Sequence, residues 1–195
     1  MIKLENMSKE KLDAIGTTIG EAYYAEDDSM IQTCFQTKEE CILYFQILVK
    51  SCYNMGILYS ISPKLEGFVA YYRKNQLSFW RLLKMLYHFR KAGLSASMKA
   101  MGNMHPGWIE GNQKYKKEKD FVEVYMAVVP REYQGNGYLH KLLEDPFALA
   151  RKNNIPCILD TNTNLKALKY QHCGMKVIDH KPYPNNVDMY TLEYR

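Results

Sequence analysis

Several features that would assign a chain to a class at once are missing from this sequence. No stretch of the 195 residues approaches the roughly 20 uncharged apolar residues of a membrane-spanning helix, and residues 1–5 lack the apolar core of a signal peptide. The five cysteines form no Cys-x-x-Cys pair, which argues against a zinc site and against a disulfide framework. We therefore expect a cytoplasmic protein with no transmembrane segment and no bound metal.

Acidic residues are also missing from one long segment. Between Gly67 and Ile109 there is no Asp or Glu, whereas seven Lys and Arg residues occur there, more than the net charge of +5 of the whole chain. Within this segment, apolar residues recur at helical spacing on one face and basic residues on the opposite face. This pattern predicts a basic helical insertion at about 75–104. Its basic face is either solvated surface, part of an acceptor pocket, or a contact for an acidic ligand or an anionic membrane. Nucleic-acid binding would need aromatic and basic side chains on one face, so we expect no nucleic-acid partner.

The remaining composition favours one domain. At 47% hydrophobic residues, residues 1–195 are sufficient for one buried core and few for two, so we expect a single domain. Ser8 and Thr37 are expected N-caps, Thr37 within a capping box. The expected elements are a strand at 3–5, helices from Ser8 to Tyr23 and from Thr37 to about Lys50, strands at 56–61 and 67–72, a loop at 181–186 and a final strand at 187–193.

The most specific local signal is an apolar strand that leads into a glycine turn and then into a helix. Residues 121–129 form a β-prone apolar run that contains one acid, Glu123. Gly135 and Gly137 follow, and apolar residues then recur at helical spacing from Leu139. Glycine can turn successive N–H groups toward one point, and a helix start offers free donors and a positive dipole end. This layout predicts an anion-binding cradle.

Two better-known phosphate cradles do not fit these residues. A Walker loop requires Lys and then Ser or Thr after its second glycine, where this chain has Tyr138 and Leu139. A dinucleotide fingerprint requires a third glycine in an early βαβ unit and an acid downstream.

Two strings resemble motifs of the GNAT superfamily of acyl-CoA-dependent N-acetyltransferases. Gln134-Gly135-Asn136-Gly137-Tyr138-Leu139 resembles motif A, Gln/Arg-x-x-Gly-x-Gly/Ala, with Leu139 in the slot where Gly or Ala is usual. Tyr170-Gln171-His172-Cys173-Gly174-Met175 resembles the end of motif B, Tyr-x-x-x-Gly-Phe, with Met175 in place of Phe. The resemblance covers residues 121–177 well and the remainder only by layout.

The resemblance implies an α+β, GNAT-like fold of three layers, with a central mixed, mostly antiparallel sheet flanked by helices. It implies an N-acetyltransferase that moves an acetyl group from acetyl-CoA to a primary amine by direct attack in a ternary complex. The acceptor is a small-molecule amine or a peptide, and a homodimer is compatible with this reading. The alternative is a non-catalytic acyl-CoA-binding sensor or interaction module.

The resemblance also implies which residues bind the coenzyme. A strand N–H near Val128, where the strand of the superfamily bulges, would polarise the thioester carbonyl. Asn164 is the candidate for the pantetheine arm, in competition with Asn162 and Lys166. The full expected set is Ala127, Val128, Val129, Gln134, Gly135, Asn136, Gly137, Tyr138, Leu139 and Asn164.

Amide formation requires two further roles. An amine with a pKa near ~10.4 is mostly protonated at neutral pH, so a base must uncover its lone pair. Glu123 is the candidate, because some superfamily members carry a catalytic Glu there; the alternative is a structural acid that faces solvent or pairs with a lysine. A tyrosine with a pKa near ~10 can protonate the leaving thiolate. Tyr170 is the candidate for this acid, and a packing role is its alternative.

Overall fold

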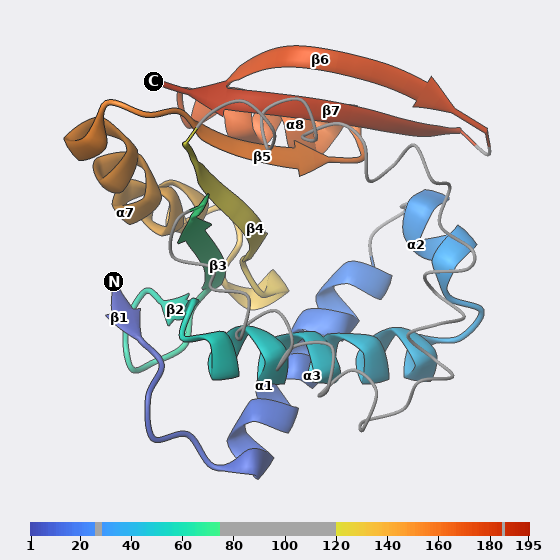
Figure 1. Cartoon of the computed structure of the whole chain (residues 1–195). Helices are drawn as coiled ribbons and strands as arrows, with labels where there is room; N and C mark the ends of the chain where they lie inside the picture. The colour runs from blue at the N-terminus through green and yellow to red at the C-terminus, as the bar shows by residue number, and fades with distance from the viewer. Residues whose placement is uncertain (26–28, 75–119, 185) are drawn as a thin grey trace.

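The structure is a computed structural model that describes residues 1–25, 29–74, 120–184 and 186–195 (Figure 1). The basic insertion expected at about 75–104 lies outside these residues. None of the helices in the described part of the chain is long and apolar enough to cross a membrane.

A mixed sheet of seven strands forms the centre of the described structure. Every neighbouring pair in it is antiparallel except β4 and β5, which are parallel. The mixed, mostly antiparallel sheet that the resemblance implies is thus confirmed. In spatial order the strands are β1 (Ile2–Lys3), β2 (Leu58–Ser60), β3 (Phe68–Arg73), β4 (Val122–Val128), β5 (Cys157–Thr161), β7 (Val187–Tyr194) and β6 (Lys176–Tyr183).

Helices cover both faces of this sheet and give the three layers that the resemblance implies (Figure 1). One apolar core joins β4 to α1 (Lys9–Tyr24), α2 (Ser29–Cys34) and α3 (Lys38–Met55). A second core, on the other face, joins the sheet to α7 (Tyr138–Asn153) and α8 (Asn164–His172). A short 3-10 turn, η3 (Arg131–Tyr133), connects β4 to α7.

The expected caps begin the first long helices. Ser8 Oγ accepts a hydrogen bond from the Lys11 N–H at 3.3 Å, and Thr37 Oγ1 accepts one from the Glu40 N–H at 3.2 Å. The end expected for the second helix is wrong, because α3 continues past Lys50 to Met55. Its last turns still bury apolar side chains, and the helix ends only at Gly56, whose φ of 68° is left-handed.

The loop expected at 181–186 is also wrong in its first half. β6 continues to Tyr183, and Lys181, Pro182 and Tyr183 pair with β7. β6 is an edge strand in which no residue is fully buried, and its sequence lacks the alternation of apolar and polar residues that would reveal a strand.

Glycines let α1 and α3 approach closely. A Cβ on Gly16 would lie 2.4 Å from the Cα of Gln46, and one on Gly20 would lie 2.7 Å from the Cα of Ile42. Both contacts are with backbone atoms, so no rotation of a side chain could relieve them. Only glycine allows this separation of the two helices.

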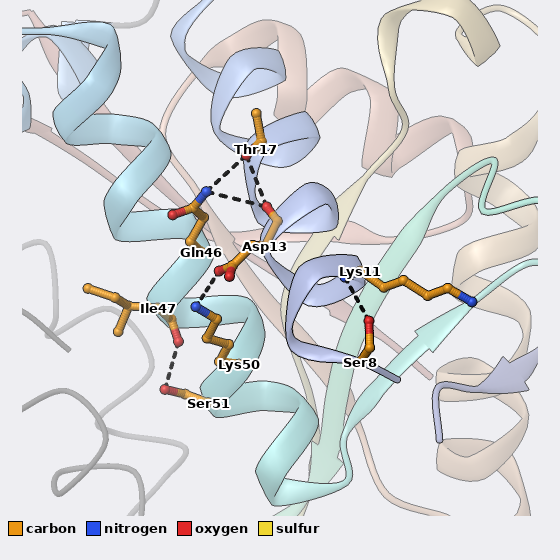
Figure 2. A network of polar contacts seen from close by, with 8 residues as sticks. All are labelled: Ser8, Lys11, Asp13, Thr17, Gln46, Ile47, Lys50 and Ser51. Atoms are coloured by element: carbon orange, nitrogen blue, oxygen red, sulfur yellow. Dashed lines mark hydrogen bonds and ion pairs between the residues drawn. The ribbon is translucent and has the colours of Figure 1, made fainter. Parts of the chain in front are cut away.

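Polar contacts hold the same crossing in register (Figure 2). Gln46 Nε2 on α3 donates to Thr17 Oγ1 at 3.0 Å and to the Asp13 carbonyl at 3.4 Å, both on α1. Lys50 on α3 forms an ion pair with the Asp13 carboxylate. The two helices therefore act as one rigid wall on their face of the sheet.

Candidate active site

The parallel strands β4 and β5 lie side by side only where they begin. Val122 is opposite Cys157 and Glu123 is opposite Ile158, and the register between them extends no further (Figure 1). The second half of β4 therefore has an edge that no described strand covers.

β4 also bulges, at Tyr125. Its pairing with β3 skips this residue between Val124 and Met126. A bulge reverses which face the following side chains occupy. Val124 packs in the core of α7 and α8, whereas Met126 and Val128 pack in the core of α1 and α3. We expected the bulge near Val128, and it lies three residues earlier.

A cavity of about 690 Å³ opens where the strands diverge. Its described lining includes the second half of β4, the end of β5 and the beginning of α7. It also includes parts of α8, α1, α2 and α3, so the cavity reaches both helical layers. Its size is typical of pockets that enclose a small ligand.

The glycine turn forms one end of this cavity. Gly135 and Gly137 have φ values of 81° and 72°, in the left-handed region that other residues rarely adopt. A Cβ on either would meet no atom within 4 Å, so the turn presents bare backbone to open space. Asn136 Nδ2 donates to the carbonyls of Tyr133 and Gln134, both at 3.2 Å, and so stiffens the turn. These features fit a phosphate group.

Most residues expected to bind the coenzyme meet at this cavity. Asn136 and Asn164 are the exceptions, since neither is among its described lining residues, whereas Asn162 and Lys166 are. Lys166 Nζ donates to Asn162 Oδ1 at 3.3 Å, so the two form one polar unit. The residues that line the cavity are Ala127, Val128, Val129, Gln134, Gly135, Gly137, Tyr138 and Leu139.

The two candidates for acid and base occupy different surroundings. Tyr170, half-buried in the last turn of α8, lines the cavity. Glu123 does not; it is 6% exposed and accepts a hydrogen bond from the Tyr72 hydroxyl on β3. Burial and the neighbouring carboxylate of Glu123 raise the pKa of Tyr72, so its hydroxyl stays a donor.

Tyr125, two residues after Glu123 on β4, was not expected at the site. It is 46% exposed and lines the cavity. Desolvation raises the pKa of its hydroxyl well above the ordinary value, and Tyr44, Cys52, Glu123 and Tyr72 add to this effect. A tyrosine two residues after an acid in a strand is the only local signal, and the bulge depends on pairing with β3.

Sequence reasoning also missed the apolar side of the cavity. Two of the helices there, α1 and α3, were expected only as elements of the fold, and α2 was not expected. Their side chains carry no charge, and the described ones are Ala22, Tyr23, Met30, Ile31, Cys34, Phe35, Tyr44, Phe45 and Leu48.

No described side chains form a group of three or more His, Cys, Asp or Glu that could hold a metal.

Comparison with known proteins identifies the fold. No protein-family model matches the sequence, and no curated protein is significantly similar to it. Among solved structures, arylalkylamine N-acetyltransferase 2 from Aedes aegypti matches with a TM-score of 0.58 at 12% identity, over 97% of this chain and 96% of that one. A protein assigned to the GNAT family of acetyltransferases, from Desulfovibrio desulfuricans, matches with a TM-score of 0.56 at 11% identity, over 98% and 95%. This chain has the GNAT fold.

A further structure with the GNAT fold, the NatC complex bound to Gag peptide and CoA, matches with a TM-score of 0.52 at 14% identity, over 99% of this chain and 95% of that one. The GNAT resemblance of the two motifs is thus confirmed for the fold. Identities this low carry the fold alone, so the chemistry of this chain must be argued from its own cavity.

Proposed function

We propose that this chain is an N-acetyltransferase that transfers the acetyl group of acetyl-CoA to a primary amine by direct attack in a ternary complex. One observation carries the proposal: a single cavity joins the glycine turn, the gap between β4 and β5, and Tyr170. The CoA in the NatC structure, which shares the fold, supports coenzyme A as the carrier.

The donor would bind along the side of the cavity that contains the glycine turn. Backbone N–H groups of the turn and of the first turn of α7 suit the pyrophosphate. The edge of β4 that faces the gap can pair with the amides of the pantetheine arm, as a neighbouring strand would. One of its N–H groups would polarise the thioester carbonyl.

In the proposed step, the neutral amine nitrogen attacks the carbonyl carbon, a C–N bond forms and the C–S bond breaks. Tyr170 donates a proton to the departing sulfur, and the single proton that the nitrogen loses as the amide forms restores the Tyr170 hydroxyl. Before the attack, Glu123 accepts one proton from the acceptor ammonium by way of Tyr125, which lies two residues further along β4 and lines the cavity. The products are the amide, the free thiol of coenzyme A and one proton.

The glycine turn offers a test with a matched control. Gly137→Ala and Gly56→Ala introduce the same methyl group at nearly equal φ values, 72° and 68°. Each should cost about 1–2 kcal/mol of folding stability, because the left-handed conformation disfavours a Cβ. Only Gly137→Ala places the methyl group in the open space of the cradle, so only this variant should weaken acetyl-CoA binding, by about tenfold or more in calorimetry.

Equal loss of acetyl-CoA affinity in both variants would contradict the proposed cradle. If the wild-type protein binds acetyl-CoA but releases no thiol with any amine, the alternative of an acyl-CoA sensor applies instead.

A further inference from the structure

We propose that the acceptor amine carries an apolar body, an alkyl chain or an aryl ring, that packs against a wall formed by α1, α2 and α3. This inference rests on the proposed acetyl transfer, since it assigns the other half of the same cavity. The wall, called the acceptor wall below, comprises Tyr23, Met30, Ile31, Phe35, Tyr44 and Phe45.

The acceptor wall and the glycine turn belong to opposite layers of the fold. The wall lies in the core of α1 and α3, whereas the turn precedes α7, which packs on the other face of the sheet. The cavity joins these layers where β4 and β5 diverge. Acetyl-CoA held by the glycine turn would therefore bring its thioester into the gap between β4 and β5. An amine that attacks from the opposite layer would pack against the acceptor wall.

The charges of the cavity are concentrated away from the acceptor wall. Among the described lining residues, all that are charged or ionisable, apart from Tyr and Cys, come from α7, α8 and β5, namely His140, Asp160, Lys166, Lys169 and His172. A hydrophilic body would lose its water against the acceptor wall, whose own six side chains carry no charge to replace it, and this is costly. An apolar body gains by the same transfer.

One charged residue of the described lining, Lys166, lies beside the acceptor wall. The Lys166 ammonium lies 5.2 Å from the centre of the Tyr23 ring. It would repel a second cationic group on the acceptor, and it would favour the neutral form of the attacking amine. Burial raises the pKa of Tyr44 to about 12, as expected for a dry surface.

The wall is also already assembled, because its aromatic rings support one another. Tyr23 and Phe45 stack with ring centres 4.5 Å apart, and Tyr44 meets Phe45 edge to face at 5.3 Å. Phe35 lies against Tyr44 at 5.3 Å. Such contacts hold the rings in place, so a ligand need not order them on binding.

The first experiment measures thiol release from acetyl-CoA with a series of acceptors. From ethylamine to hexylamine, kcat/KM should rise about fourfold for each added methylene, the equivalent of about 0.8 kcal/mol per buried CH₂. Replacing hexylamine by 1,6-diaminohexane should lower kcat/KM at least tenfold, because the second ammonium would lie against the wall. A flat series, or a preference for the diamine, would overturn the inference.

A substitution in the wall should remove this preference. Met30→Glu adds a carboxylate that can pair with the distal ammonium of 1,6-diaminohexane, so the ratio of hexylamine to diamine should fall at least tenfold. Met30→Leu should keep the wild-type ratio. Leu43→Glu adds the same charge at an exposed position of α3 outside the cavity, and it should keep the ratio too. An equal change in Met30→Glu and Leu43→Glu would contradict a specific wall.

Two further measurements distinguish a wall that binds the acyl chain of the donor from failure of the proposed function. If hexanoyl-CoA with ethylamine is used more efficiently than acetyl-CoA with hexylamine, the wall holds the acyl chain of the donor, and the inference is wrong. If no amine releases thiol, the proposed function fails, and calorimetry with coenzyme A and each amine still tests the wall. Hexylamine should then bind at least tenfold more tightly than 1,6-diaminohexane, and equal affinities would overturn the inference by themselves.

Discussion

The contact between α1 and α3 allows a prediction whose size follows from the structure. In Gly16→Ala the new Cβ would lie 2.4 Å from the Cα of Gln46, whereas carbon atoms in contact normally lie about 3.5–4.0 Å apart. The helices must therefore separate by about 1 Å. Such overpacking costs about 1–3 kcal/mol, and the rigid backbone contact places this site at the upper end.

Helix propensity opposes this cost. Alanine is better than glycine in a helix by about 1 kcal/mol, so the net loss for Gly16→Ala is about 2 kcal/mol. For a chain of this size, that loss lowers Tm by about 4–8 °C. Ala14→Gly, at an exposed position of the same helix, measures the propensity alone and should cost about 1 kcal/mol. Thermal unfolding and urea titration would give both values.

The same substitution should affect activity in a specific way. α1 supplies Tyr23 to the acceptor wall, so a shift of α1 should raise KM for the amine and leave acetyl-CoA affinity nearly unchanged. Two results would refute the reasoning: a Gly16→Ala protein as stable as the wild type, or full rescue of its stability by Gln46→Ala, which leaves the clashing Cα in place.

Three other predictions concern single side chains. Tyr170→Phe should lower kcat by roughly 10² to 10⁴ fold and change acetyl-CoA affinity less than about tenfold. The control Tyr24→Phe, outside the cavity, should change neither quantity. Unchanged turnover in Tyr170→Phe would leave that tyrosine a packing role. Glu123→Gln should lower kcat/KM at neutral pH by about 10²-fold, and kcat/KM of this variant should recover toward pH 10 as the free amine becomes abundant. A constant deficit in kcat/KM at every pH would argue against Glu123 as the proton acceptor. Burial raises the pKa of the Cys52 thiol from 9.0 to about 12, so above pH 9 the unfolded chain loses a proton that the folded chain keeps, and stability falls as pH rises. Cys52→Ala should reduce this fall by up to about 1.4 kcal/mol per pH unit between pH 10 and 12, and an unchanged slope in alkaline urea titrations would contradict the assignment.

Short-range features of this protein could be predicted because they depend on a few adjacent residues. The caps at Ser8 and Thr37 need only a side-chain oxygen and an N–H three residues later. The turn at Gly135 and Gly137 needs backbone angles that glycine adopts freely. The sequence by itself therefore determined the strand, turn and helix at the centre of the site, and through their order the fold.

Tertiary structure alone decided how the remaining site is built, because its parts are distant in the chain. Glu123 meets Tyr72, 51 residues earlier, since β3 and β4 are neighbours in the sheet. The bulge at Tyr125 exists only in the register of β4 with β3. The acceptor wall comes from helices whose apolar side chains look, in sequence, like any other buried face. The packing of all elements together sets the point where β4 and β5 diverge and the apolar face that borders the cavity. No local sequence pattern encodes either feature.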